Sequence, residues 1–187
     1  MRGKDALTLK SMSIMSVGVL LLAAAASTAA VAQTGAASDW PSTPHSKASG
    51  RFAVAQIATI DADQFMDEWR KPTPGVRLKT STRTRRNQPI FTFITFRGCH
   101  ADAAGKCNVT VTYDVSAPSG KTYAHSTMDV WASQPQPPKD YIQLSRQGFG
   151  LVFDQKDGLG SYIVRATTTD HVAGISVQTQ QELVVSD

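Results

Sequence analysis

The feature that most constrains the fold is the run from Asn108 to Val115, in which polar and apolar residues alternate without interruption. Successive side chains of a β-strand point to opposite faces, so the run fits a strand that is buried on one face only. A helix would spread the same apolar residues around its circumference. The apolar positions are Val109, Val111, Tyr113 and Val115, and the polar positions are Asn108, Thr110, Thr112 and Asp114. The run therefore predicts a half-buried strand.

Other segments carry related signals. The run IFTFITF from Ile90 to Phe96 is apolar on both faces, which predicts a central strand that is covered on both sides. Further strands are expected at 123–130, 151–153, 161–168 and 175–185, and Ala117–Gly120 is a turn signal. Short strands punctuated by Gly, Pro and Asp predict an all-β antiparallel sandwich.

Residues 60–72 leave two interpretations open. Asp61 could cap a short helix in which Phe65 and Trp69 lie on one side and which Pro72 ends. The competing interpretation is an edge strand that ends at Pro72, because the segment is too short for its periodicity to decide.

The N-terminus has the pattern of a secretory signal peptide. Three cations precede an apolar run at 14–26 that ends in the small residues of 30–32. We expect the leader to span residues 1–32 and to be cut before Gln33, which gives a periplasmic or secreted protein without a membrane span. Loss of the leader would halve the formal net charge of +4, so the overall basicity does not indicate nucleic acid as a partner.

The mature chain reads as one domain behind a tether. Residues 33–54 are rich in Ala, Ser, Pro and Gly, and we expect this segment to be a flexible, disordered tether. The remaining residues, 55–187, have an ordinary domain size and are sufficient for one hydrophobic core.

The only two cysteines are Cys99 and Cys107. An even pair in an exported protein favours a disulfide, which here would fix one short loop. His100 and Asp102 lie in the same loop, but bridged cysteines do not ligate a metal as thiolates. We therefore expect the disulfide Cys99–Cys107, no metal and no cofactor.

Two motifs resemble a known architecture. The segment DGLGSYIVRA at 157–166 is similar to the closing hairpin of bacterial immunoglobulin-like domains, and Ala117–Lys121 resembles a turn between two of their strands. The span 65–185 also resembles exported single-domain bacterial proteins without an assigned activity, in which a G-C-x-x-D-x-x-G-x-C loop lies beside a V-x-V-x-Y strand.

This resemblance implies an immunoglobulin-like antiparallel β-sandwich of about seven to eight strands. Tyr113, Tyr162 and Val164 would lie in its core, and the hydroxyl of Tyr162 would hold the preceding loop. The cysteine pair that joins the two sheets of antibody domains is absent, because both cysteines lie in one loop. The fold alone does not identify a function.

The densest charge cluster comprises Lys79, Arg83, Arg85 and Arg86. In an extended strand the first three would share a face and could bind an anionic partner. The alternative is a solvated edge strand whose charges discourage edge-to-edge aggregation. No aromatic residue lies between these cations, as binding of single-stranded nucleic acid would require.

Trp131 precedes a proline-rich connection, where it could be a recognition surface or a lid over one end of the core. The histidines and carboxylates form no catalytic grouping that their spacing reveals.

The leading hypothesis is a non-enzymatic binding or scaffolding module that recognises an envelope protein or glycan through loops or an edge strand. The alternative is a metal-binding or hydrolytic protein with a distributed site, in which His100 and Asp102 meet His125 or His171. The sequence leaves the oligomeric state open.

Overall fold

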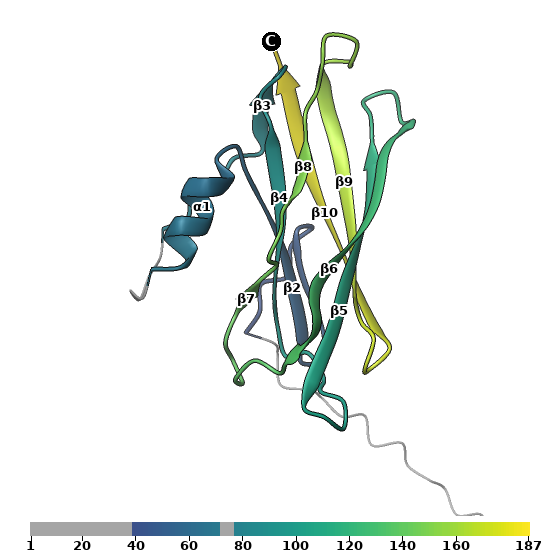
Figure 1. Cartoon of the computed structure of the whole chain (residues 1–187). Coiled ribbons are helices and arrows are strands. Elements are labelled where there is room, and N and C mark those ends of the chain that lie inside the picture. Colours follow the sequence, from purple (N-terminus) through teal and green to yellow (C-terminus); the bar gives the residue numbers. More distant parts are fainter. Residues whose placement is uncertain (1–38, 72–76) are drawn as a thin grey trace, which may run out of the picture. The chain divides into compact units, whose positions relative to one another are not determined.

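A computed structural model describes residues 39–71 and 77–187. The predicted leader and the start of the predicted tether lie outside the described residues. The described chain forms two five-stranded sheets (Figure 1). Sheet A has the order β1 (Ser46–Ser49), β2 (Phe52–Thr59), β4 (Ile90–Arg97) and β7 (Gln143–Leu144), and β8 (Phe149–Leu151) also pairs with β4. Sheet B has the order β3 (Arg83–Arg85), β10 (Ile175–Ser186), β9 (Gly160–Asp170), β5 (Lys106–Ser116) and β6 (Thr122–Pro135).

All strand pairs are antiparallel except β3 and β10, which run parallel. The two sheets enclose one hydrophobic cluster to which both contribute, as in a sandwich. This strand order is that of an immunoglobulin-like β-sandwich. The described residues form ten strands, more than the expected seven to eight. The additional strands are short and have no clear period in the sequence, so sequence patterns do not reveal them.

The alternation in β5 determines which side chains fill the core. Val109, Val111, Tyr113 and Val115 are each at most 2% exposed, whereas the residues between them are half-buried or exposed. The hydroxyl of Tyr162 donates to the carbonyl oxygen of Gly158 at 2.9 Å. This bond ties the loop before β9 to the core, as the motif predicts.

Helix α1 (Ala62–Trp69) decides the open question at residues 60–72 in favour of a helix. The side chain of Asp61 caps it by accepting a bond from Gln64 N at 3.1 Å. Phe65 is fully buried and stacks on Phe93 of β4, with ring centroids 4.9 Å apart. The helix thus covers the face of sheet A that is turned away from the sandwich core, which explains why β4 is apolar on both faces.

The prediction of a tether over 33–54 is wrong at its C-terminal end. Strands β1 and β2 begin at Ser46 and Phe52, and Phe52 and Val54 are fully buried. The error has a physical cause: β1 consists of small and polar residues and forms a tight hairpin with β2, and β2 is held in the sheet by β4, a non-local contact that composition does not reveal. The folded domain therefore begins before residue 55. Among the described residues no helix is long and apolar enough to cross a membrane.

Candidate functional site: the two edges of sheet B

The basic cluster lies at one edge of sheet B. Only residues 83–85 of the predicted strand are extended, in β3, where Arg83 and Arg85 are exposed and Thr84 is 3% exposed. Lys79 lies outside β3, so the predicted alignment of Lys79 with the two arginines on one strand is wrong. The paired register with β10 begins at Arg83, opposite Val184, so Lys79 is not held in it. We call Arg83 and Arg85 the cationic edge.

Arg86 has a different role from its two neighbours. Its guanidinium donates to Gln155 Oε1 at 3.1 Å and to the carbonyl oxygen of Asp157 at 3.0 Å. It also forms an ion pair with Asp187 at 3.1 Å, and its side chain is only 20% exposed. Arg86 therefore ties the loop before β9 and the C-terminal residue to the end of β3, whereas within the described chain neither Arg83 nor Arg85 forms an ion pair.

The outer edge of β3 is closed by its own neighbours. Even-numbered residues bond toward β10, as the bond from Val184 N to the oxygen of Thr82 shows, so Arg83 and Arg85 direct their backbone groups outward. Ser81 Oγ accepts from Arg83 N at 3.1 Å and donates to Arg83 O at 2.8 Å. Gln88 accepts from Arg85 N through Oε1 at 3.3 Å and donates its own N–H to Arg85 O at 3.1 Å.

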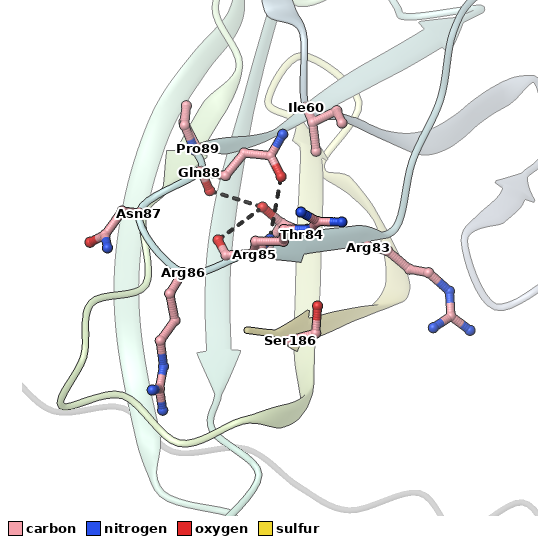
Figure 2. A pocket seen from close by; sticks show the side chains of 9 residues that line it. All are labelled: Ile60, Arg83, Thr84, Arg85, Arg86, Asn87, Gln88, Pro89 and Ser186. Atoms are coloured by element: carbon pink, nitrogen blue, oxygen red, sulfur yellow. Dashed lines mark hydrogen bonds between the residues drawn. The ribbon is translucent and has the colours of Figure 1, made fainter.

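Figure 2 shows Gln88 folded back over Thr84, while the side chain of Arg83 points away from the loop. The surrounding hollow has a volume of about 780 Å³ and is lined by Ile60, residues 83–89 and Ser186. Two exposed guanidinium groups beside such a hollow could bind an anionic group. They could also serve only to keep other strands away.

The opposite edge of sheet B is β6, which is 14 residues long and in the described chain pairs only with β5. The register is regular from Ala124, opposite Val115, to Asp129, opposite Thr110. It shifts on both sides of this stretch. We call residues 124–129 the open edge. His125, Thr127 and Asp129 are exposed there.

The hydrogen-bond pattern of β5 shows which way its backbone groups point. His171 N donates to the oxygen of Asn108 at 2.9 Å, so even-numbered residues of β5 bond toward β9. In an antiparallel ladder the bonded side alternates from one residue to the next. The odd-numbered residues Val111 and Tyr113 therefore bond toward β6.

The same alternation applies to β6. Met128 and Ser126 lie opposite Val111 and Tyr113 and use their backbone groups on β5. The residues in between, His125, Thr127 and Asp129, therefore direct their N–H and C=O groups away from β5. These groups form a row of donors and acceptors along the open edge, which is the surface that an added strand requires.

A groove lies beside the open edge. It has a volume of about 370 Å³ and is lined by residues 127–132, Gln134, Arg146 and Gln147. Trp131 is half-buried in its wall, where it packs edge-on against Phe96 with ring centroids 5.9 Å apart, and its indole N–H donates to the oxygen of Pro135 at 2.9 Å. Trp131 therefore covers part of the core and also lines this groove.

The side chain of Tyr123 connects the start of β6 to the loop before β9. Its hydroxyl contacts Asp157 Oδ2 at 3.0 Å and the oxygen of Val152 at 3.3 Å. Desolvation, followed by the hydrogen bond to Asp157, raises the pKa of Tyr123 above its ordinary value. The neutral hydroxyl that makes both bonds is thus favoured, and these bonds hold the start of β6 to the loop before β9.

The predicted grouping of His100 with Asp102 does not form. His100 Nδ1 lies 2.9 Å from Asp170 Oδ2, whereas Asp102 accepts bonds from the backbone of Ala104 and Lys106. His125 and His171 contact other residues: His125 lies 2.7 Å from Asp114, and His171 lies 2.8 Å from Thr110. Across 39–71 and 77–187 no three His, Cys, Asp or Glu side chains are gathered as metal ligands would be.

The expected disulfide joins Cys99 and Cys107. Gly98 precedes it with a φ of 72°, and a Cβ there would lie 2.1 Å from the oxygen of Arg51. Only glycine fits this position. Arg51 and Gln136 both donate to the oxygen of Cys99, at 3.2 and 2.7 Å, so the loop is fixed from two sides.

Sequence reasoning identified the cationic edge but not the open edge. The residues of β6 read as an ordinary strand, and only the order of strands in the sheet shows that its second side is unpaired. The polar residues His125, Thr127 and Asp129 indicate a solvated face, but one polar face is shared by edge strands and by central strands of a half-exposed sheet.

No protein-family model matches this sequence, and no curated protein matches it. Solved structures with similar folds include the CARDB domain of a Pyrococcus furiosus protein in complex with di-metal ions, at 12% identity and a TM-score of 0.35 over 58% of this chain and 83% of that one. An immunoglobulin-like protein from Pseudomonas aeruginosa has 11% identity and a TM-score of 0.30 over 60% and 84%. The sporulation control protein Spo0M from Bacillus subtilis has 10% identity and a TM-score of 0.40 over 74% and 51%. These similarities are too weak to support an inference about function. The strand order itself shows that the chain has an immunoglobulin-like β-sandwich fold.

Proposed function

We propose that this protein is a non-enzymatic binding module that recognises an extended protein segment by strand addition at the open edge of β6. The observation that carries the proposal is the outward row of backbone groups at His125, Thr127 and Asp129, which no other described strand pairs. An added strand gains affinity from main-chain hydrogen bonds and specificity from alternate side chains. The groove beside Trp131 would receive some of those side chains.

The contrast with β3 supports the choice of edge. There the outward groups of Arg83 and Arg85 are already bonded to Ser81 and Gln88, so a strand arriving at β3 would first have to break those bonds. At β6, no side chain of residues 39–71 or 77–187 caps the backbone of residues 124–129 in this way. The N-terminal pattern and the disulfide favour the periplasm or the cell exterior as the place where the module works.

The test is a selection of displayed random peptides of about eight residues, a common strand length. Binding peptides should show a period of two in their side chains. On binding, the backbone amides of His125, Thr127 and Asp129 should become protected from hydrogen exchange in NMR spectra. The amides of Ser126 and Met128 should change little, because they are already bonded to β5.

A matched pair of proline variants supplies the control. Thr127→Pro removes an outward N–H and should abolish peptide binding while the protein stays folded, since proline is tolerated on an edge when its nitrogen faces solvent. Ser126→Pro removes a bond to β5 and should cost about 1–3 kcal/mol in the free energy of unfolding, measured in urea. Peptides that bind equally well to Thr127→Pro would contradict the proposal.

A further inference from the structure

We infer that the strand to which β6 is best matched is β6 of a second copy, so that two chains form one continuous sheet across a two-fold axis at Thr127. This inference rests on the proposed function, because it needs the same open edge. It names the partner: a second copy of this chain, running antiparallel.

The outward backbone groups define the pairing. In a two-fold pair centred on Thr127, the residue lies opposite its own copy, and His125 lies opposite Asp129 of the second copy. All three positions direct their N–H and C=O toward the open edge, so each opposing pair exchanges two backbone hydrogen bonds. The outward N–H and C=O groups that have no strand partner in one chain would therefore bond to the same groups of the second chain.

The charges select this register over its neighbours. A shift of the axis to His125 would place two imidazoles opposite each other, and a shift to Asp129 would place two carboxylates opposite each other. Like charges in directly opposite positions destabilise a pair of strands, which disfavours the register centred on Asp129, and the register centred on His125 gains no pairing of an imidazole with a carboxylate. The register centred on Thr127 instead sets an imidazole against a carboxylate on both sides of the axis.

The two faces of the new sheet also agree with this register. On the outer face, Thr127 is already held by Thr112 at 2.9 Å, and His125 is held by Asp114 at 2.7 Å. Their side chains therefore lie against β5 and leave the edge accessible. On the core side, Met128 would lie opposite Ser126 of the second copy, which sets a long side chain against a short one.

The paired stretch has a built-in limit. The register between β5 and β6 shifts beyond Asp129, and on the other side Tyr123 is bonded to the loop before β9. Pairing is therefore confined to about the open edge, residues 124–129. An interface of this size is at the small end for protein association, so we expect a reversible dimer that depends on concentration.

The test uses single cysteines in the mature protein, which has no free cysteine among its described residues. In a bonded antiparallel pair the Cα atoms lie about 5.5 Å apart, which suits a disulfide. Under mild oxidation Thr127→Cys should form a covalent dimer, whereas His125→Cys and Asp129→Cys should not. Sedimentation equilibrium of the unmodified protein should show a dimer that Thr127→Pro abolishes and Arg85→Ala, on the opposite edge, leaves unchanged.

Charge variants test the register independently. His125→Lys places a permanent cation opposite Asp129 of the second copy and should tighten the dimer about two- to fivefold for each symmetric pair. The double variant His125→Lys with Asp129→Lys should weaken the dimer below the level of the unmodified protein.

Three results would overturn the inference: a monomer at every concentration, cross-linking of His125→Cys in preference to Thr127→Cys, or a dimer that survives Thr127→Pro. If the dimer fails while selected peptides still bind and are lost in Thr127→Pro, strand addition stands and its partner is another protein. If both fail, the open edge is not a binding surface.

Discussion

The two edges of sheet B, β3 and β6, bound the same sheet but handle their unpaired backbone in opposite ways. β3 has three residues, carries two exposed arginines and has its outward groups bonded to Ser81 and Gln88. β6 has 14 residues and leaves a regular stretch uncapped. Exposed edges invite pairing with other chains, and proteins usually protect them. Among the described residues, one edge is thus protected several times over, whereas residues 124–129 of the other edge are left without a side-chain cap, as the proposed strand addition requires.

The largest effect on stability within this comparison should come from Arg86. Arg86→Ala removes two hydrogen bonds and an ion pair from a mostly buried side chain, and we expect a loss of about 1–3 kcal/mol in the free energy of unfolding. Arg83→Ala, a change at an exposed side chain of the same strand, should stay within about 0.5 kcal/mol. Urea denaturation measures both. Equal losses would show that the cationic edge is also part of the structural framework.

A smaller effect should follow when β3 loses its caps. The double variant Ser81→Ala with Gln88→Ala returns both outward groups of Arg83 and the N–H of Arg85 to solvent, at a cost of about 1 kcal/mol. The backbone N–H of Gln88 still bonds Arg85 O. The informative result is association: in a Thr127→Pro background, uncapped β3 should now self-associate in sedimentation experiments. If the uncapped protein remains monomeric, the arginines or the shortness of β3 are sufficient protection by themselves.

The smallest effect on the free energy of unfolding at neutral pH should come from Tyr123, at the start of β6. The pKa of Tyr123 is raised in the folded state, mainly by desolvation and then by its bond to Asp157. Below pH 10 the phenol keeps its proton in both states. Above the ordinary tyrosine value of 10.0 the unfolded chain loses this proton first, so the free energy of unfolding falls as the pH rises. Tyr123→Phe should therefore show a shallower alkaline loss of stability in urea titrations, and an unchanged slope would contradict this assignment.

Much of the sandwich follows from local patterns. The period of two predicts β5. The apolar run of β4 predicts cover on both faces, and on the face away from the sandwich core α1 provides it through Phe65. The disulfide follows from an even pair of cysteines in a protein expected to be exported, and the hydroxyl bond of Tyr162 follows from the motif that resembles immunoglobulin-like domains. These features depend on residues that are close in sequence or on a face that one element presents.

The parts that were missed depend on non-local pairing. The hairpin of β1 and β2 is held in its sheet by β4, and β3 is held by the last residues of β10. The same holds for the candidate site, since the open edge is defined by a strand that is missing beside β6. The pairing of His100 with Asp170, in place of Asp102, joins residues far apart in the chain. No local period encodes such contacts.

Asp170 has a consequence for the loop that contains the disulfide. Its fully buried carboxylate accepts bonds from the backbone and ring of His100 through one oxygen and from the backbone of Val172 and Ala173 through the other. These hydrogen bonds hold the loop to the β9–β10 hairpin independently of the disulfide. Reduction of Cys99 and Cys107 would break the disulfide and leave the hydrogen bonds of Asp170 in place. The shape of this end of the domain should therefore survive in a reducing compartment, and the bridge reinforces a loop conformation that hydrogen bonds already specify.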